Sequence, residues 1–290
     1  MRTLDATSAR IAGRQNGVVT RQQLLAAGIT RSGIRRRVAK GALIAVHPGV
    51  YRVGHAAPSV AAVYTAAVLA CGPGAVLAGR AAGQVLGLVR GKPPRPEVLS
   101  PRKRRLEGVV VSRCRRIDPR DVARVHDIPI TTVPRTVVDL AGSVSAAEIA
   151  RAVHQGQVLH GVTPENVEAV LARRPNTRGA RTLREVLRGG VLLGELEREF
   201  RKLLKDERLP LPVVNRKTDG HYLDCRWPDQ RLTVELTSFR YHNTRQSWEQ
   251  DRERGRRARA RGDRFREYTW YDVVEASGPT RVELHRLLGS

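Results

Sequence analysis

The stretch GVVTRQQLLAAGITRSGIRRRVAKGALIAVHPGVYRVG, residues 17–54, decides the fold of the N-terminal part of the chain. Thr20 and Thr30 have side chains that cap helices, and each precedes a short helical segment that ends at a glycine. Two β-prone runs, residues 43–46 and 50–53, follow on either side of a His-Pro-Gly turn. The stretch therefore predicts two helices followed by a β-hairpin.

A further helix, residues 6–15, comes before this stretch and ends at the helix stop signal Asn16-Gly17. The resulting order of one helix, a helix-turn-helix and a two-stranded wing is typical of a winged-helix domain. We place this domain at residues 1–57.

Apolar residues define the inner faces of the two capped helices. In the first of them we expect Leu24 and Leu25 to face the core. In the second, Ile34 and Val38 are four residues apart, which predicts one buried stripe.

Basic residues surround that stripe, and no acidic residue lies between Arg21 and Arg52. In a helix-turn-helix the second helix enters the major groove of DNA, where an arginine can bind guanine through two hydrogen bonds. We predict DNA contacts from the second helix, and a phosphate or minor-groove contact from Arg52 in the wing. The predicted residues on the helix are Arg31, Arg35, Arg36, Arg37 and Lys40. The alternative is a solvated surface helix in an arginine-rich chain.

The charge of the whole chain favours a polyanionic partner. The net charge is +24 over 290 residues, and residues 1–57 carry ten basic side chains against one acidic. The three cysteines are far apart and form no paired motif, which argues against a disulfide framework or a zinc site. The most apolar run, residues 60–71, is too short for a membrane span, which needs ~20 residues. We expect a cytoplasmic protein with no membrane segment.

The rest of the chain predicts two further domains, which makes the fold class α+β multidomain. Residues 58–190 form a mixed α/β middle domain with a helical connector. Its expected helices are 60–71, 80–88, 145–160 and 164–173, and its expected strands are 97–100 and 108–113. Residues 191–290 show the order αβββαβ: a helix up to Pro210, strands near 213–217, 222–227 and 232–236, a polar helix over 245–261, a strand at 265–269, and a closing helix.

Residues 17–54, together with DIPITTVPRTVVDLAG in the middle region, resemble the AbiEi-type antitoxins of abortive-infection toxin–antitoxin systems. The resemblance covers roughly residues 5–142. It implies a winged helix that binds promoter DNA and represses its own operon, and it allows for a partner toxin. For the segment TTVPRTVVDLA, packing and turn chemistry alone are the preferred explanation.

Two carboxylates stand out in the C-terminal domain, Asp224 in HYLDCRW and Glu235 in LTVEL, each on an apolar strand. If Asp229 and Gln230 form a two-residue hairpin loop, the two carboxylates lie directly opposite each other, with Cβ atoms ~5 Å apart. A three-residue loop would break this register. Opposed carboxylates are destabilising unless a cation lies between them, and their oxygens suit Mg²⁺ or Mn²⁺.

The pattern ELEREF … HYLDCRWPDQRLTVELTSFRYH … DRERGRRARARGDRFREYTWYDV is similar to the Vsr-like endonuclease domains of the PD-(D/E)XK, or restriction-endonuclease-like, superfamily. The resemblance implies that Asp224 and Glu235 hold a divalent metal that activates water to cleave a phosphodiester. It further assigns His242 and Asp251 as the polar pair that follows, and Glu197 as the helix carboxylate. Glu197, with its neighbours Glu195 and Glu199, is also consistent with an ordinary solvated helix face that pairs with Arg201 and Lys202.

One position departs from this pattern. Such domains carry an acidic residue and a glycine where this chain has Thr237 and Ser238, and threonine cannot replace that charge. The sequence therefore leaves two functions open. One is a DNA-binding protein with a metal-dependent endonuclease-like domain. The other is a non-enzymatic transcriptional autoregulator, or a type IV antitoxin, whose nuclease-like domain is inactive.

Overall fold

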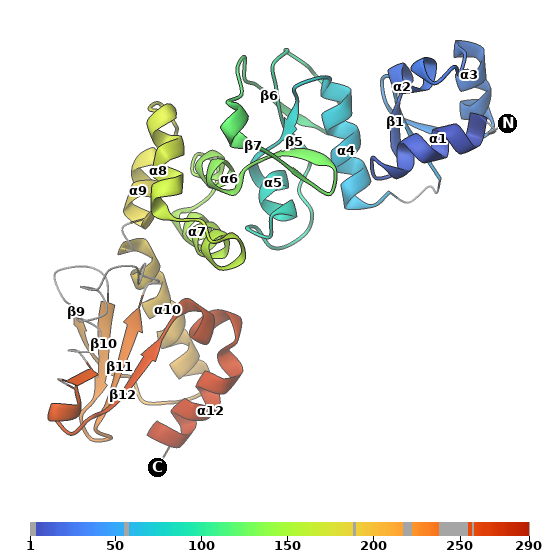
Figure 1. Ribbon diagram of the computed structural model, residues 1–290. Coiled ribbons are helices and arrows are strands. Elements are labelled where there is room, and N and C mark those ends of the chain that lie inside the picture. The colour runs from blue at the N-terminus through green and yellow to red at the C-terminus, as the bar shows by residue number, and fades with distance from the viewer. Residues whose placement is uncertain are drawn as a thin grey trace. The chain divides into compact units, whose positions relative to one another are not determined.

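The structure is a computed structural model that describes residues 4–54, 58–187, 190–216, 222–237, 255–256 and 258–289 (Figure 1). The chain divides into two compact units. The first comprises Met1–Ser143 and Gln155–Thr177, and the second comprises Val144–His154 and Arg178–Ser290. Helices and three separate sheets are present in the described part, which agrees with the predicted α+β multidomain class. The domain boundaries at residues 57 and 190 stay predictions.

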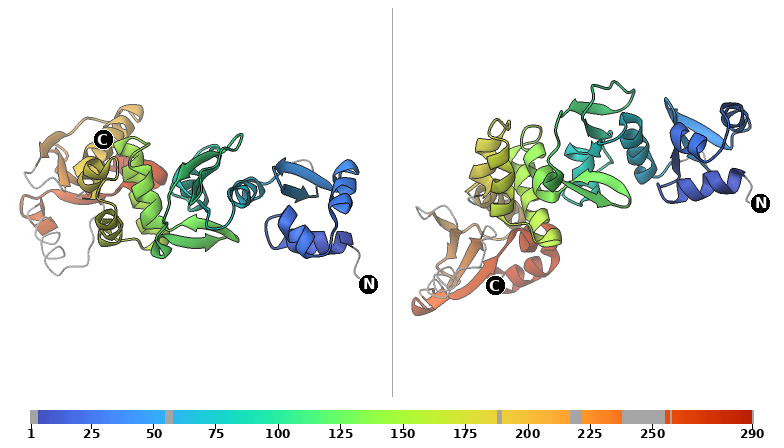
Figure 2. Two further views of the ribbon diagram at one scale, coloured as in Figure 1. Left: turned by 90° about the horizontal axis from the view of Figure 1, so that it is seen from above. Right: turned by 45° about the horizontal axis from the view of Figure 1, so that its top comes forward.

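The N-terminal elements follow the order predicted for a winged helix, and we use that name for residues 4–54. They are α1 (Leu4–Gly13), β1 (Val18–Thr20), α2 (Arg21–Ala26), α3 (Arg31–Ala39), β2 (Leu43–His47) and β3 (Val50–Val53). The hairpin of β2 and β3 is joined by β1, which the sequence did not predict, and the antiparallel sheet has the order β1-β3-β2. Both views in Figure 2 show α1, α2 and α3 grouped beside this small sheet.

Threonine side chains begin the two helices of the helix-turn-helix. Thr20 Oγ1 accepts a hydrogen bond from the Gln23 backbone N–H (3.2 Å), and the Gln23 side chain accepts one from the Thr20 backbone N–H (2.9 Å). This reciprocal pair is a capping box. Thr30 Oγ1 likewise accepts from the Gly33 backbone N–H (3.1 Å), so the predicted caps are confirmed.

The core of the winged helix corrects two burial predictions. Leu24 and Ile34 are buried as expected, together with Val19 and Leu43. Leu25, however, is 38% exposed, because successive residues of a helix point about 100° apart and cannot both face one core. Val38 is 37% exposed, because it lies in the last turn of α3 and the core cluster reaches this helix through Ile34.

The rest of the first unit is built on a five-stranded sheet with the order β6-β5-β4-β8-β7. Its strands are β4 (Val76–Leu77), β5 (Glu97–Ser100), β6 (Val110–Arg113), β7 (Val122–Val125) and β8 (Ile128–Thr131), with the short helix η1 (Pro119–Asp121) before β7. The helices are α4 (Val60–Cys71), α5 (Gly79–Val85), α6 (Val133–Leu140) and α8 (Pro164–Arg173); α7 (Ala146–His160) belongs partly to each unit. The bounds predicted for α4, β5 and α8 are confirmed, whereas β4, β7, β8 and α6 were not predicted.

The winged helix packs against α4 within the first unit. Val18 and Val50, from its sheet, form one buried cluster with Ala62 and Ala66 of α4. Asn16, in the turn after α1, also donates a side-chain hydrogen bond to Thr65 Oγ1 (2.9 Å). The wing sheet therefore has a covered face on the side of α4.

The second unit contains a four-stranded sheet with the order β12-β11-β10-β9. The strands are β9 (Val213–Arg216), β10 (Tyr222–Trp227), β11 (Leu232–Thr237) and β12 (Arg264–Tyr268), and the helices are α9 (Ala180–Leu187), α10 (Gly190–Asp206), the π-helical turn η2 (Tyr271–Glu275) and α12 (Ser277–Leu288). Of the predicted helix 245–261, residues 245–254 and 257 lie outside the described residues, and 255–256 and 258–260 are helical. The α9 helix was not predicted.

Helix α10 covers one face of this sheet through aromatic packing. Phe200 lies edge-on to Trp227, with ring centroids 6.4 Å apart, and its centroid is 6.0 Å from that of Tyr268. Because alternate residues of a strand point to opposite faces, this packing defines the apolar face of the sheet. The face opposite to α10 carries the residues between these apolar positions.

Candidate functional site

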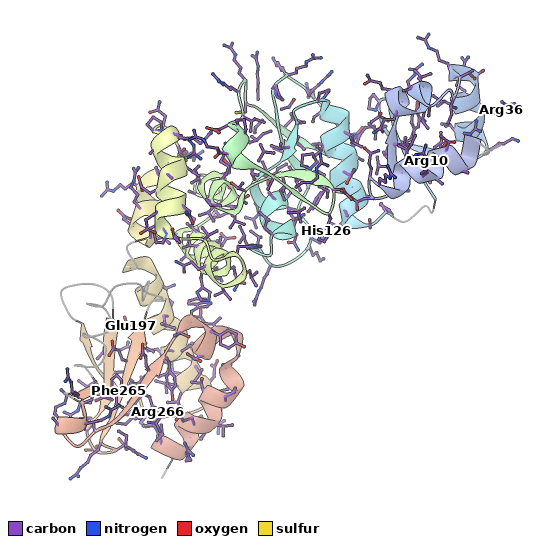
Figure 3. All side chains as sticks on the ribbon, in the orientation of Figure 1. Arg10, Arg36, His126, Glu197, Phe265 and Arg266 are labelled. Carbon is purple, nitrogen blue, oxygen red and sulfur yellow. The ribbon has the colours of Figure 1, made fainter. Side chains whose placement is uncertain are left out.

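Helix α3 presents a basic surface to solvent. Arg31, Arg35, Arg36 and Lys40 are exposed, and Ile34 makes the apolar contact of this helix with the core. Figure 3 shows Arg36 on α3, pointing away from the winged-helix core. Their exposure makes these side chains accessible to a partner, and their predicted contacts with DNA stay predictions.

Two of the predicted DNA contacts are placed differently. Arg37 is half-buried, and its Nη1 donates a hydrogen bond to the Gly33 carbonyl (3.1 Å), one turn earlier in the same helix. Arg52 is only 9% exposed and lines a cavity of about 190 Å³ between β2, β3 and α4, together with apolar residues such as Val18 and Ala62. The sequence did not reveal this, because the cover comes from α4, a helix that lies outside the wing itself.

The predicted pairing of Asp224 with Glu235 is confirmed. In the antiparallel register of β10 and β11, Asp224 lies directly opposite Glu235. The strands are joined by a turn over residues 228–231, in which the Arg231 backbone N–H donates to the Pro228 carbonyl (3.1 Å). Directly opposed residues share one face of a sheet, so the two positions belong to the face opposite to α10.

The same register continues on both sides of this pair. Glu267 of β12 is the partner of Glu235 in the parallel pairing of β11 and β12, and Asn215 of β9 is the partner of Asp224. The positions Asn215, Asp224, Glu235 and Glu267 thus form one row across the sheet. Three of the four are carboxylates, and we call it the carboxylate row. Glu235 is 1% exposed, whereas Glu267 at the edge strand is exposed.

Sequence reasoning missed Glu267. Its signal was a carboxylate in the β-prone run at residues 265–269, but the register of a parallel pair is not fixed by a short turn. The structure thus extends the predicted pair to three carboxylate positions on three adjacent strands.

An ion-paired residue anchors the neighbouring row on the same face. The Asp263 carboxylate, buried at the start of β12, accepts hydrogen bonds from Arg226 Nε (2.7 Å) and Thr233 Oγ1 (2.8 Å). Arg226 and Thr233 are partners in the β10–β11 register, one step along from Asp224 and Glu235. The Arg226 guanidinium and these hydrogen bonds hold the pKa of Asp263 below its usual range.

The structure does not bring Glu197 into the carboxylate row. Glu197 lies on α10, one turn before Phe200, and α10 packs on the opposite face of the sheet (Figure 3). Glu197 is buried, with 8% of the residue exposed, and its Oε1 lies 3.7 Å from Arg201 Nε. The alternative interpretation of this helix predicted the pairing with Arg201, but its solvated helix face does not fit the burial of Glu197.

The remaining predicted residues lie at the end of the described part of β11 or beyond it. His242 and Asp251 lie outside the described residues. Thr237 pairs with Tyr222 in the β10–β11 register, two residues beyond Glu235 on the same strand. Among the residues that the structure describes, no group of three or more His, Cys, Asp or Glu side chains is arranged to hold a metal ion.

Comparison with known families is informative for the winged helix. Residues 8–54 match a family model described as "Transcriptional regulator, AbiEi antitoxin". The match spans α1 to β3, and therefore includes the basic surface of α3. No curated protein matches the chain. In the described part of the chain, no helix has both the length and the apolar character that a membrane crossing requires.

Proposed function

We propose that the protein is a DNA-binding transcriptional regulator of the AbiEi antitoxin type, and that α3 is its recognition helix. The observation that carries this proposal is the exposed basic face of α3, which the Thr30 cap and the buried Ile34 orient outward. The family match over residues 8–54 supports it. A chain with a net charge of +24 also attracts a polyanion such as DNA over long range.

The exposed residues divide the work on DNA by their position along α3. Arg31 and Arg35 lie in the N-terminal half of the helix, the part that meets base edges in a helix-turn-helix. Arg36 and Lys40 lie further along and would contact phosphates. One donor of Arg37 is used in the hydrogen bond to the Gly33 carbonyl, which leaves its other donors for DNA. Arg52 is covered by α4, so we leave Arg52 out of the interface.

The test is DNA binding by the double variant Arg35→Ala/Arg36→Ala, with the DNA upstream of the protein's own gene as probe. We expect affinity to fall by about tenfold or more, and the slope of log K against log salt to fall by about 0.9, because Arg36 is the one proposed phosphate contact of the pair and each such contact contributes ~0.9. The matched control is Arg181→Ala/Arg286→Ala, which removes two exposed, salt-bridged arginines from the second unit. Equal binding by both double variants would place the DNA contact elsewhere.

A second function, metal-dependent cleavage of a phosphodiester, is favoured by the carboxylate row. Glu235 is 1% exposed and lies in register between the positions of Asp224 and Glu267. Burial of a carboxylate beside like charges is costly unless a cation or a proton compensates it. Oxygen donors of this kind fit Mg²⁺ or Mn²⁺, and Asp224 and Glu235 are the residues that we propose to hold the ion.

A bound divalent ion would supply Lewis acidity and lower the pKa of a water molecule. In this proposal the chain's own residues position the DNA strand and handle protons, with His242 as acid or base and Asp251 as its polar neighbour. Glu197, which the resemblance implied as the helix carboxylate, lies on the helix that covers the opposite face, and it is left out of the proposed ligand set. Thr237 stands where relatives of this pattern carry an acidic residue, which weakens the proposed site.

Plasmid nicking in Mg²⁺ or Mn²⁺ tests this second function. The native chain should cut, whereas Asp224→Asn and Glu235→Gln should reduce cutting to background. Glu185→Gln, a substitution at an exposed position on α9, should cut like the native chain. The same background from all four proteins would leave the non-enzymatic regulator, with or without a partner toxin, as the function of the chain.

A further inference from the structure

Five arginines line one cavity in the first unit. They are Arg116, Arg120, Arg135, Arg173 and Arg174, and the cavity has a volume of about 400 Å³. Two carboxylates, Asp118 and Asp121, complete its charged lining. The lining therefore carries an excess of three positive charges, which no part of the DNA-binding or cleavage proposals uses.

Three separate segments bring these arginines together. The first is the loop before η1 together with η1 itself, the second is α6, which carries Arg135, and the third is the C-terminal end of α8, where Arg173 and Arg174 lie. Arg135 belongs to the segment TTVPRTVVDLA, which the sequence analysis could explain by packing alone. The structure gives this arginine a charged environment instead.

Ion pairs hold the buried part of the cluster. Asp121, which is 1% exposed, accepts from Arg135 Nη1 (2.7 Å) and from Arg173 Nη2 (2.5 Å). Arg135, also 1% exposed, donates through Nε to Asp139 (2.9 Å). At the rim, Arg120 is exposed and donates two hydrogen bonds to the Asp118 carboxylate, from Nε (3.1 Å) and from Nη2 (2.7 Å). Arg120, Arg135 and Arg173 are thus held by carboxylates before any ligand arrives.

Several donors in the cluster remain unused. Arg135 Nη2 and Arg174 Nε are buried, and no residue in the described part of the chain accepts a hydrogen bond from them. Arg173 Nε is in the same condition, with Asp118 Oδ2 at 3.5 Å as its nearest ion-pair partner. A buried guanidinium donor without an acceptor is costly. Asp139 Oδ2 is a buried acceptor that is also unused, so the three unused donors outnumber it and indicate room for a further acceptor.

We infer that this cavity binds a small phosphorylated ligand. Phosphate oxygens are acceptors for several guanidinium groups at once, and arginine forks match their geometry. The volume lies in the range of small-molecule sites and has room for more than a single phosphate group. The lining contains no aromatic residue on which a nucleobase could stack. The recognised chemistry is therefore the phosphate moiety, such as a diphosphate.

A DNA backbone does not fit the same observations as well. Arg116 and Arg120 are exposed at the rim and within reach of a duplex, but Arg135 is 1% exposed. A duplex cannot approach a side chain that is buried to this degree. Arg173 and Arg174 are half-buried, but the three unused donor atoms are themselves buried, and a small ligand can reach them more readily than a duplex can.

The experiment measures binding of sodium pyrophosphate to the full chain in two ways, by isothermal titration calorimetry and by thermal unfolding. Sodium chloride at the same ionic strength is the control for both. Pyrophosphate should bind and raise the midpoint of unfolding, since a ligand of the native state stabilises it. Arg174→Gln should weaken binding by about tenfold, the effect of one lost charged hydrogen bond. The hydrogen bonds to Asp121 come from Arg135 and Arg173, so this variant keeps the buried ion pairs.

Arg181→Gln is the matched control, because its side chain is 93% exposed and lies in the other unit. It should bind pyrophosphate like the native chain. Absence of binding by the native chain, or an equal loss in Arg181→Gln, overturns the proposal. A loss of DNA affinity in Arg120→Gln and Arg174→Gln, without any pyrophosphate binding, would also overturn it and make the cavity a DNA contact. The proposal does not depend on α3, because none of these variants touches that helix.

Discussion

The arginines of α3 and those around Asp121 share one chemistry in opposite surroundings. Arg35 and Arg36 are exposed, and no acidic residue occurs in the sequence from Arg21 to Arg52. Arg135 is 1% exposed and shares Asp121 with Arg173. The exposed arginines of α3 are accessible to a large polyanion such as duplex DNA. The arginines around Asp121 are held in place around a cavity.

This difference shows that net charge locates a partner only together with burial and pairing. Both groups contribute to the excess of positive charge, and composition alone treats them as equal. An exposed arginine costs little to keep without a partner, whereas a buried one must be compensated by carboxylates or by a ligand. We call Asp121, Arg135, Asp139 and Arg173 the Asp121 cluster. The stability of the fold should therefore depend on this cluster, and the affinity for DNA should depend on α3.

The largest expected effect is the loss of stability in Asp121→Ala. This change leaves Arg135 buried with only Asp139 as its carboxylate partner, and breaking a buried ion pair from one side costs about 4 kcal/mol. Urea unfolding of the full chain, followed through the first unit, measures it. Asp118→Ala is the control, because Asp118 lies at the exposed rim, and it should cost much less. Comparable losses would mean that the buried network is not what stabilises this region.

A smaller effect separates the core of α3 from its basic face. Ile34→Ala should destabilise the winged helix by about 3 kcal/mol, because it empties a fully packed position. Val38→Ala, on the same helix, should change stability by less than about 0.5 kcal/mol, since Val38 is 37% exposed. Thermal and urea unfolding of the two variants compare them directly. A large loss of stability in Val38→Ala would mean that Val38 and Ile34 form one buried stripe, as the sequence predicted.

Local signals explain which parts of the fold could be predicted from the sequence. The caps at Thr20 and Thr30 depend on residues within three positions, and the pairing of Asp224 with Glu235 depends on one short turn. Each of these features is decided inside a few consecutive residues, so the amino-acid types are sufficient. The winged helix as a whole combines several such signals in one order.

Features that depend on distant segments could not be predicted. Arg52 is covered because α4 packs on the wing sheet, and nothing in the wing itself indicates that helix. Glu267 joins the carboxylate row through a parallel pairing, whose register is set across a long connection. Arg135 meets Asp121 and Arg173 only once η1, α6 and α8 come together. In all three cases the missing information is tertiary packing.

The smallest expected effect is a pH dependence at Asp139, which tests whether the Asp121 cluster compensates its own charges. Burial raises the pKa of Asp139 above its usual range, even though Arg135 Nε donates to it. A carboxyl whose pKa is higher in the folded than in the unfolded state favours folding below its unfolded value of about 3.9, and this contribution disappears as pH rises through the folded pKa. The stability of the native chain relative to Asp139→Asn should therefore fall from pH 3.5 upward by a modest amount, measured as unfolding free energies in urea across a pH series. A difference that grows with pH instead would mean that Arg135 more than compensates the buried charge, and the cluster would then need no ligand to balance it.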